Sequence, residues 1–284
     1  MASARGVRAV IVGGTGECGR HILGEIVCSP IYTEVLSLGR RTTTIPEKFK
    51  ATESDLKKLK QEIVDFDLEK FTVENCKSYF ECKDVLFVAL GMSFADARRQ
   101  PGRTIDTYRL VDFHLVARSA EIAKAAGVRH VSMLSVEEAN SSSWFSVLKV
   151  KGEAEDAVEA LGFERTSIWR VNCVDKGQNN TFFEKIFNFF LKTVRVEDLG
   201  QAVREESEQW ALRNTDFPPV SRYAMRDIFE FVRQAKEGEA KKRDNGAISE
   251  GKKAGQQPGC DLSNERSDPV GGATANDKTD KQED

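Results

Sequence analysis

The sequence predicts an α/β fold of the Rossmann type: a doubly wound parallel sheet with helices on both faces. Apolar, β-branched stretches alternate with amphipathic ones over the first two-thirds of the chain. A glycine-rich turn, residues 13–19, directly follows the first apolar stretch. This alternation is typical of parallel sheets whose crossover helices cover both faces. We therefore expect a dinucleotide-binding domain over residues 1–235 and a disordered polar tail over residues 236–284.

The expected strands begin with residues 7–12, which are apolar on both faces, as in a central strand covered on both sides. Further strands are predicted at residues 35–38, 63–66, 85–90, 128–134 and 166–171. Apolar residues at helical spacing predict helices from residue 17, over about 104–126 and over about 144–161. From about residue 172 we expect helices on the substrate or partner side. Among them, the phenylalanine-rich residues 182–191 either cover the core or contact a subunit or a membrane surface.

The tail and the overall composition limit the classes of function. Large apolar residues almost disappear after residue 236, so this segment cannot bury enough surface to offset its conformational entropy. With 42 basic and 45 acidic residues, the chain offers no electrostatic case for nucleic acid. No apolar run reaches the 18 residues that would suggest a transmembrane helix.

The cysteines and the start of the chain bear on compartment. Six cysteines occur without a CxxC pair, which argues against a zinc site and a disulfide framework, so we expect no metal and a reducing compartment. The first residues lack the apolar core of a signal peptide. A cytoplasmic protein is expected, with a nuclear or organelle-surface form as the alternative.

The glycine turn is the main candidate for binding chemistry. It stands between a strand and a helix, where glycines permit a tight turn and let the backbone approach a pyrophosphate. The helix start then offers unpaired N–H groups to the phosphates. A purely structural turn is the alternative. The expected phosphate-binding residues are Gly13, Gly14, Thr15, Gly16, Glu17, Cys18 and Gly19.

The residues after the second strand indicate which dinucleotide binds. An acidic residue there would favour NAD, but this chain has Arg40 and Arg41, whose guanidinium groups suit the 2′-phosphate of NADP. We therefore expect NADP(H) rather than NAD(H), with two solvated surface arginines as the alternative. Asp65 and Phe66 follow the third strand, where they could contact the adenine. The fourth strand ends in small residues that let the backbone approach the cofactor, Ala89, Leu90 and Gly91.

These features together resemble an atypical branch of the short-chain dehydrogenase/reductase superfamily, and within it the Tat-interacting oxidoreductase-like proteins, a family of NADPH-binding regulators. The resemblance covers about residues 8–232. Its carriers are GGTGECGRHIL (13–23), LGRR (38–41), VDF (64–66), ALG (89–91), RLVDFHLVARSAEIAKAAGVRHVSMLS (109–135), KVKGEAE (149–155) and RVEDLGQAV (195–203).

The resemblance implies a catalytic Ser, Tyr and Lys, with the Tyr four residues before the Lys on one helix face. Residues at this spacing are neighbours, so the ammonium can lower the phenol pKa and hold the nicotinamide ribose. Lys151 occupies the lysine position, but Val147 replaces the tyrosine. Ser135 stands at or next to the serine position. After the sixth strand, where relatives typically carry Pro-Gly, this chain has Arg170, Val171 and Asn172.

Three functions remain open on this basis. The favoured one is an NADP(H)-binding protein that has lost tyrosine-based catalysis and acts as a cofactor-responsive regulator or scaffold, through a protein partner or a homodimer. The second is an active NADPH-dependent oxidoreductase in which Lys151, Ser135 or a water supplies the proton. The third is a structural role without any cofactor. His114 beside Asp112 could form an acid–base pair, although a structural role is favoured for it.

Overall fold

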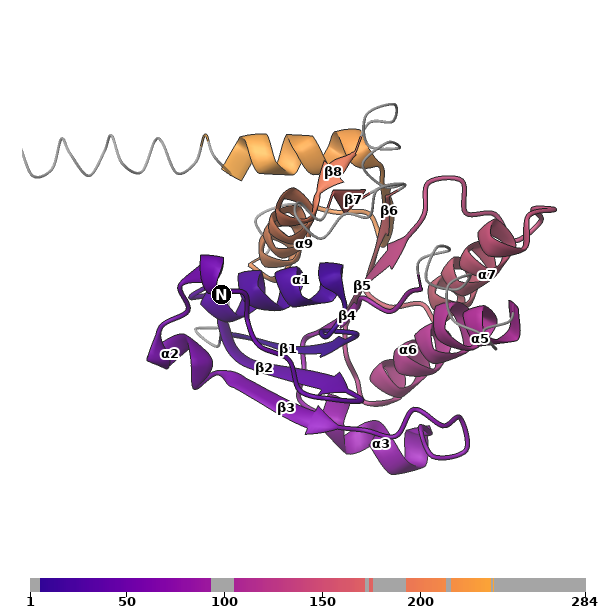
Figure 1. Ribbon diagram of the computed structural model, residues 1–284, viewed down its shortest axis with the longest axis horizontal. Coiled ribbons are helices and arrows are strands. Elements are labelled where there is room, and N and C mark those ends of the chain that lie inside the picture. Colours follow the sequence, from indigo (N-terminus) through magenta and orange to yellow (C-terminus); the bar gives the residue numbers. More distant parts are fainter. Residues whose placement is uncertain are drawn as a thin grey trace, which may run out of the picture. The chain divides into compact units, whose positions relative to one another are not determined.

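A seven-stranded sheet organises the computed structural model, which describes residues 6–92, 105–171, 174–175, 193–212, 216–235 and 237. The strand order is β3-β2-β1-β4-β5-β6-β9, and every neighbouring pair is parallel (Figure 1). The chain runs outward from β1 in one direction through β2 and β3, and in the other through β4, β5, β6 and β9. The β1–β4 junction is therefore a topological switch point, where open α/β sheets bind their ligands.

The main strands are β1 (Val7–Val12), β2 (Tyr32–Gly39), β3 (Leu59–Ile63), β4 (Val85–Val88), β5 (His130–Ser135), β6 (Arg165–Arg170) and β9 (Val220–Tyr223). A separate pair contains β7 (Val174–Asp175) and β8 (Val194–Arg195). The helices are α1 (Glu17–Cys28), η1 (Glu47–Phe49), α2 (Glu53–Leu56), α3 (Val73–Phe80), α5 (Ile105–Arg109), the π-helical turn η2 (Leu110–His114), α6 (Leu115–Ala125), α7 (Ser146–Ala160) and α9 (Val196–Ala211). Residues 225–235 are also helical.

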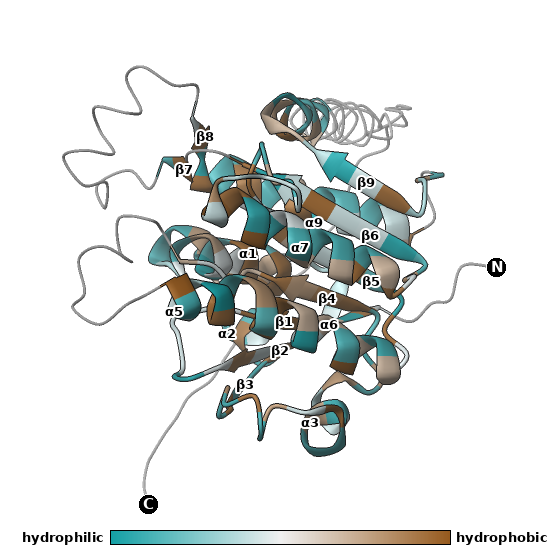
Figure 2. Cartoon of the chain, turned by 90° about the vertical axis from the view of Figure 1, so that its right-hand side faces the viewer, coloured by the Kyte–Doolittle hydropathy of each residue, from teal (hydrophilic) through white to brown (hydrophobic). Residues whose placement is uncertain are grey.

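Two apolar cores cover the two faces of the sheet, as the doubly wound prediction requires. Side chains of β1 alternate between them, because successive residues of a strand point to opposite faces. Val10 and Val12 join a core with α3, α6 and α7, whereas Ala9 and Ile11 join one with α1, α9 and residues 225–235. Figure 2 shows strand β4 in brown, the colour of hydrophobic residues. The predicted fold class is confirmed.

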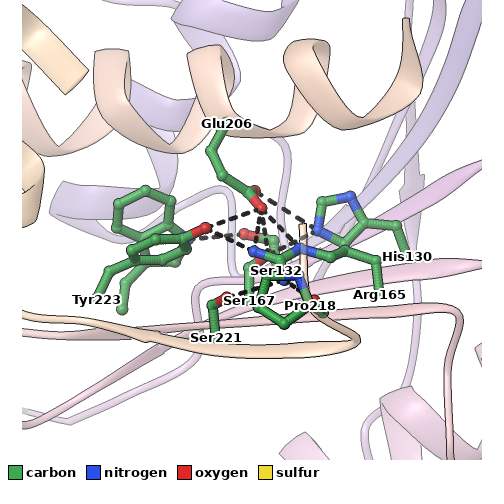
Figure 3. Close-up of polar contacts among 9 residues, drawn as sticks. His130, Ser132, Arg165, Ser167, Glu206, Pro218, Ser221 and Tyr223 are labelled. Carbon is green, nitrogen blue, oxygen red and sulfur yellow. Dashed lines mark hydrogen bonds and ion pairs between the residues drawn. The ribbon is translucent and has the colours of Figure 1, made fainter. Parts of the chain in front are cut away.

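A buried polar network fastens α9 to the amino-terminal halves of β5 and β6 and to β9 (Figure 3). Glu206 of α9 accepts hydrogen bonds from Arg165 Nε at 2.9 Å and Nη2 at 2.7 Å, and from Ser167 Oγ at 2.7 Å. Arg165 Nη2 also donates to the Tyr223 hydroxyl at 2.5 Å. His130 Nε2 lies 3.6 Å from the other Glu206 oxygen. Because Arg165 and Glu206 are both 0% exposed, each charge is compensated by the other and by the polar groups of this network.

Two predicted elements differ from the observed ones. Strand β3 is Leu59–Ile63 rather than residues 63–66, and its pairing with β2 begins at Val35 opposite Leu59. It is an edge strand with polar, exposed residues, so apolar content does not mark it; Val64 and Phe66 pack on the core after it has ended. The helix predicted over residues 104–126 contains η2, which changes the phase of its side chains. Residues 182–191 and the tail from residue 238 lie outside the described residues, so their predictions and the domain boundary stay untested.

Candidate functional site

The glycine loop connects β1 to α1 at the switch point, and its geometry requires glycine at two positions. Gly13 has a φ of +92°, and a Cβ there would lie 2.6 Å from the carbonyl of Ala89. A Cβ on Gly19 would lie 2.1 Å from the Gly13 oxygen. By contrast, a Cβ on the exposed Gly16 would meet that oxygen at an ordinary 3.5 Å. Gly13 and Gly19 thus serve the turn itself, whereas Gly16 leaves space on the outer side.

The start of α1 has the features of an anion site. Gly16 is its N-cap and gives no side-chain cap, so the first N–H groups of a 12-residue helix are not capped from this position. Glu17, the first helical residue, forms an ion pair with Arg20 at 2.5 Å, which offsets its negative charge near the loop. Cys18 is half-buried. This cradle of glycines and helix N–H groups fits the pyrophosphate of a dinucleotide.

The end of β2 lies beside the loop, as the sequence predicts. A Cβ on Gly14 would lie 2.8 Å from Ser37 Oγ, and one on Gly39 would lie 3.5 Å from Thr15 Cγ2. Arg40 and Arg41 follow directly and are both exposed. Within the described residues, neither guanidinium group forms an ion pair. Both are therefore accessible to an anionic ligand at this edge.

The structure gives Asp65 and Phe66 other partners than an adenine. The Asp65 carboxylate lies 2.7 Å from Lys70 Nζ, and this hydrogen bond lowers the pKa of Asp65. The Phe66 ring lies 4.8 Å from the ring of Phe71 and packs on the core. Both residues still follow β3 at the carboxyl edge, so their contact with adenine stays a prediction.

Lys151 lies at the carboxyl end of β4, next to the site. Its side chain is 7% exposed, and Nζ lies 2.7 Å from Asp112 Oδ1. A Cβ on Gly91 would meet both groups, at 3.4 Å from Asp112 Oδ1 and 3.5 Å from Lys151 Nζ. Ala89 N donates to Val12 O at 2.8 Å and joins the two central strands just beyond β4.

Sequence reasoning missed the role of Asp112, which it considered only as a partner of His114. Asp112 is 0% exposed and pairs with Lys151, whereas His114 is exposed and contacts the Phe113 ring. The His114–Asp112 acid–base pair therefore does not form. One signal was available: Asp112 is a charged residue three positions before the inward-facing Leu115 and seven before the buried Ser119.

Ser135 does not present a free hydroxyl. Its Oγ donates to Glu155 Oε1 at 2.5 Å, and Glu155, 1% exposed, also pairs with Arg170 at 2.5 Å. Val147 is half-buried on α7, four residues before Lys151, and offers no proton. The buried phenol of Tyr108 is one turn before Asp112; burial, and then the charge of Asp112, raises its pKa. Of the two predicted catalytic residues, Lys151 and Ser135, Lys151 is thus the one whose functional group lies beside the end of β4, the strand that lies against the glycine loop.

Comparison with known proteins follows this geometry. No protein-family model matches the chain. The protein HTATIP2 of Rattus norvegicus is 37% identical over 160 residues, which are 56% of this chain and 60% of the rat protein. The protein FMP52, mitochondrial, of Candida glabrata is 30% identical over 240 residues, which are 79% of this chain and 95% of the yeast protein.

Solved structures share the fold at low sequence identity. A UDP-galactose 4-epimerase has a TM-score of 0.56 and 14% identity and covers 77% of each chain. MoeE5 in complex with UDP-glucose and NAD has a TM-score of 0.53 and 14% identity over 77% of this chain and 75% of its own. At such identity the likeness shows the fold alone.

The relatives correct the expected location. FMP52 proteins of Candida glabrata, Emericella nidulans and Candida albicans are named as mitochondrial, so the cytoplasmic expectation is wrong. Scattered cysteines argue against an oxidising compartment but do not separate cytoplasm from mitochondrion. Among the described residues, no helix combines the length and apolarity that crossing a bilayer requires.

The family resemblance inferred from the sequence is confirmed by these matches. The yeast protein is covered almost end to end, and the rat protein carries the Tat-interacting name. The chain belongs to the family of the HTATIP2 and FMP52 proteins.

Proposed function

We propose that this protein binds NADP(H) at the glycine loop and acts as a cofactor-responsive regulator or scaffold without tyrosine-based catalysis. The observation that carries the proposal is the cradle in which Gly13 and Gly19 admit no side chain while Gly16 leaves the α1 start open. Structural neighbours support the ligand class, because MoeE5 and a Bacillus cereus UDP-glucuronic acid 4-epimerase were both solved with NAD.

The two exposed arginines after β2 support NADP(H) over NAD(H). Arg40 and Arg41 are accessible beside Gly39, which itself lies against Thr15 of the loop. Hydrogen bonds to a charged group contribute about 1.5–3 kcal/mol, so an arginine on the 2′-phosphate favours NADPH by roughly tenfold to a hundredfold.

Titration of the full chain with NADPH and NADH, followed by energy transfer from tryptophan to nicotinamide, tests this proposal. Arg40→Ala should weaken NADPH by about tenfold and leave NADH unchanged. Arg226→Ala is the matched control. The Arg226 side chain follows β9 and is 89% exposed, so this substitution removes the same charge away from the glycine loop. Failure of the wild-type chain to bind either dinucleotide would refute the proposal.

The loss of tyrosine-based catalysis rests on two side chains. Val147 offers no proton, and the Ser135 hydroxyl is already donated to Glu155. We expect no oxidation of NADPH above the solvent background with a panel of aldehydes and ketones. Turnover on the order of 1 s⁻¹ or faster with any of them would contradict this expectation.

An active oxidoreductase is the second candidate, favoured by the buried Lys151 ammonium beside Gly91. In that case Lys151→Ala abolishes turnover while Val147→Tyr leaves it unchanged or lower. A protein partner or a homodimer stays a prediction; light scattering of the purified chain with and without NADPH measures whether occupancy changes its assembly.

A further inference from the structure

Asp112 is a carboxylate inside a helical segment with no solvent exposure, which is an unfavourable place for a charge. It persists because both of its oxygens face donors. Oδ1 lies 2.7 Å from Lys151 Nζ, and Oδ2 accepts a hydrogen bond from Met92 N at 3.0 Å. Breaking a buried pair of this kind leaves a charge without compensation. The free-energy cost of burying this carboxylate points to a functional role for Asp112.

The backbone around Asp112 is irregular, and this irregularity sets the position of the Asp112 side chain. The π-helical turn η2 separates the α-helices α5 and α6, and such turns occur frequently at functional sites. Across η2, Asp112 is buried, Phe113 is half-buried and His114 is exposed. One turn earlier, Arg109 pairs with Glu153 of α7 at 2.6 Å. Two ion pairs thus dock this segment on the helix that carries Lys151.

The same carboxylate also reaches the end of β4. Met92 directly follows Gly91, whose missing side chain leaves the space in front of Asp112 and Lys151 open. The carboxyl end of β4 in turn lies against Gly13 of the glycine loop. Asp112 therefore joins η2, α7 and the β4 end at the edge where the proposed dinucleotide lies.

We infer that Asp112 is a positioning residue that fixes the Lys151 ammonium for the nicotinamide-side ribose of the dinucleotide. The inference rests on the proposed function. In this chain Val147 provides no hydroxyl beside Lys151, so the carboxylate is the group that holds the ammonium. A lysine side chain is long and flexible, and ordering it before the ligand arrives reduces the cost of binding.

Two ligands separate this role from a general effect on the fold. NADPH extends across both halves of the site, whereas 2′,5′-ADP carries only the adenine-side phosphates. With the full chain, Asp112→Asn should weaken NADPH about tenfold and change 2′,5′-ADP less than twofold. Lys151→Met should give the same selective loss. In the Lys151→Met background, Asp112→Asn should add no further loss, because Asp112 acts through Lys151.

Two further variants keep the test decisive. Asp84→Asn is the matched control: Asp84 precedes β4 at its opposite end, accepts from Arg8 N at 2.9 Å and faces Arg129 at 3.7 Å, so its change should leave both ligands unaffected. Asp112→Glu keeps the buried charge and displaces it, and should also lower NADPH affinity relative to 2′,5′-ADP.

The outcomes distinguish the inference from the proposed function. If wild-type protein binds both ligands and the Asp112 variants leave the ratio of their affinities unchanged or raised, the positioning role is refuted. Equal weakening of both ligands, in step with the folded fraction measured by circular dichroism, would also refute it. Absence of binding to the wild-type chain would overturn the proposed function together with this inference.

Discussion

Replacing Arg165 with methionine should destabilise the fold strongly, because it leaves Glu206 buried without its counter-charge. Arg165 and Glu206 are both 0% exposed and joined at 2.7 Å and 2.9 Å. Breaking a buried pair by removing one partner costs about 3–5 kcal/mol. Glu206→Gln should lower the free energy of unfolding by a similar amount, because it leaves the Arg165 guanidinium group without a counter-charge and this group cannot lose its proton.

The two variants should respond differently to pH. Burial raises the pKa of Glu206, and Arg165 opposes that effect, so the pKa rises further in Arg165→Met. A carboxyl with a raised folded-state pKa binds its proton more tightly when folded. The destabilisation is therefore complete above the folded-state pKa and shrinks as pH falls from there towards the unfolded-state pKa. Between pH 7 and pH 5 the relief can reach about 2.7 kcal/mol. Glu206→Gln has no such proton to gain here and should show no comparable relief.

Urea unfolding at pH 7 and pH 5, followed by circular dichroism, measures both effects. The double variant Arg165→Met/Glu206→Leu removes both charges and should be more stable than either single variant. Losses below about 1 kcal/mol for the single variants, or a double variant whose loss is their sum, would refute the reasoning. Equal pH responses of the two single variants would refute the account of Glu206.

Three further predictions follow from the described contacts. Gly19→Ala should destabilise the fold and abolish NADPH binding, because its Cβ would lie 2.1 Å from the Gly13 oxygen. In Gly16→Ala the Cβ would lie 3.5 Å from that oxygen, so this variant should weaken NADPH binding but change the free energy of unfolding by less than about 1 kcal/mol. Thermal unfolding with and without NADPH measures both effects. Ser135→Ala should lower the free energy of unfolding by about 1–2 kcal/mol through the lost bond to Glu155 while leaving the NADPH dissociation constant unchanged; a binding defect without a stability defect would contradict this. Burial lowers the pKa of His130, so the stability contributed by the neutral imidazole is present above pH 6.5 and is lost as pH falls below it. His130→Asn should therefore flatten the acid side of a stability-versus-pH curve by up to about 1.4 kcal/mol per pH unit. An unchanged slope would exclude this role.

The parts of the fold that follow local rules were predictable from sequence. The glycine loop and the apolar strands β1, β4 and β5 are marked by their own residues, and the alternation of elements gives the doubly wound sheet. Strand β3 could not be placed, because pairing with β2 rather than apolar content defines an edge strand. The π-helical turn was equally hidden, since a helical period of 3.6 residues assumes that the helix keeps its phase.

The side-chain partners could be predicted only in part. Lys151 and Ser135 were identified through the family, yet the structure pairs them with Asp112 and Glu155, which are 39 and 20 positions away in the chain. Arg165 and Glu206 are 41 positions apart. No local pattern links residues at such separations; the topology of the sheet brings them together.

The buried network of Figure 3 gives β5 and β6 two chemically distinct ends. Their first residues, His130 and Arg165, anchor α9, whereas their last residues, Ser135 and Arg170, meet Glu155 of α7 near the candidate site. The length of each strand therefore separates the residues that anchor the fold from the residues that lie near the candidate site. Residues at the ligand-facing ends can be exchanged during evolution or by design while the anchored ends keep the architecture, so new specificities can arise on this framework without rebuilding it.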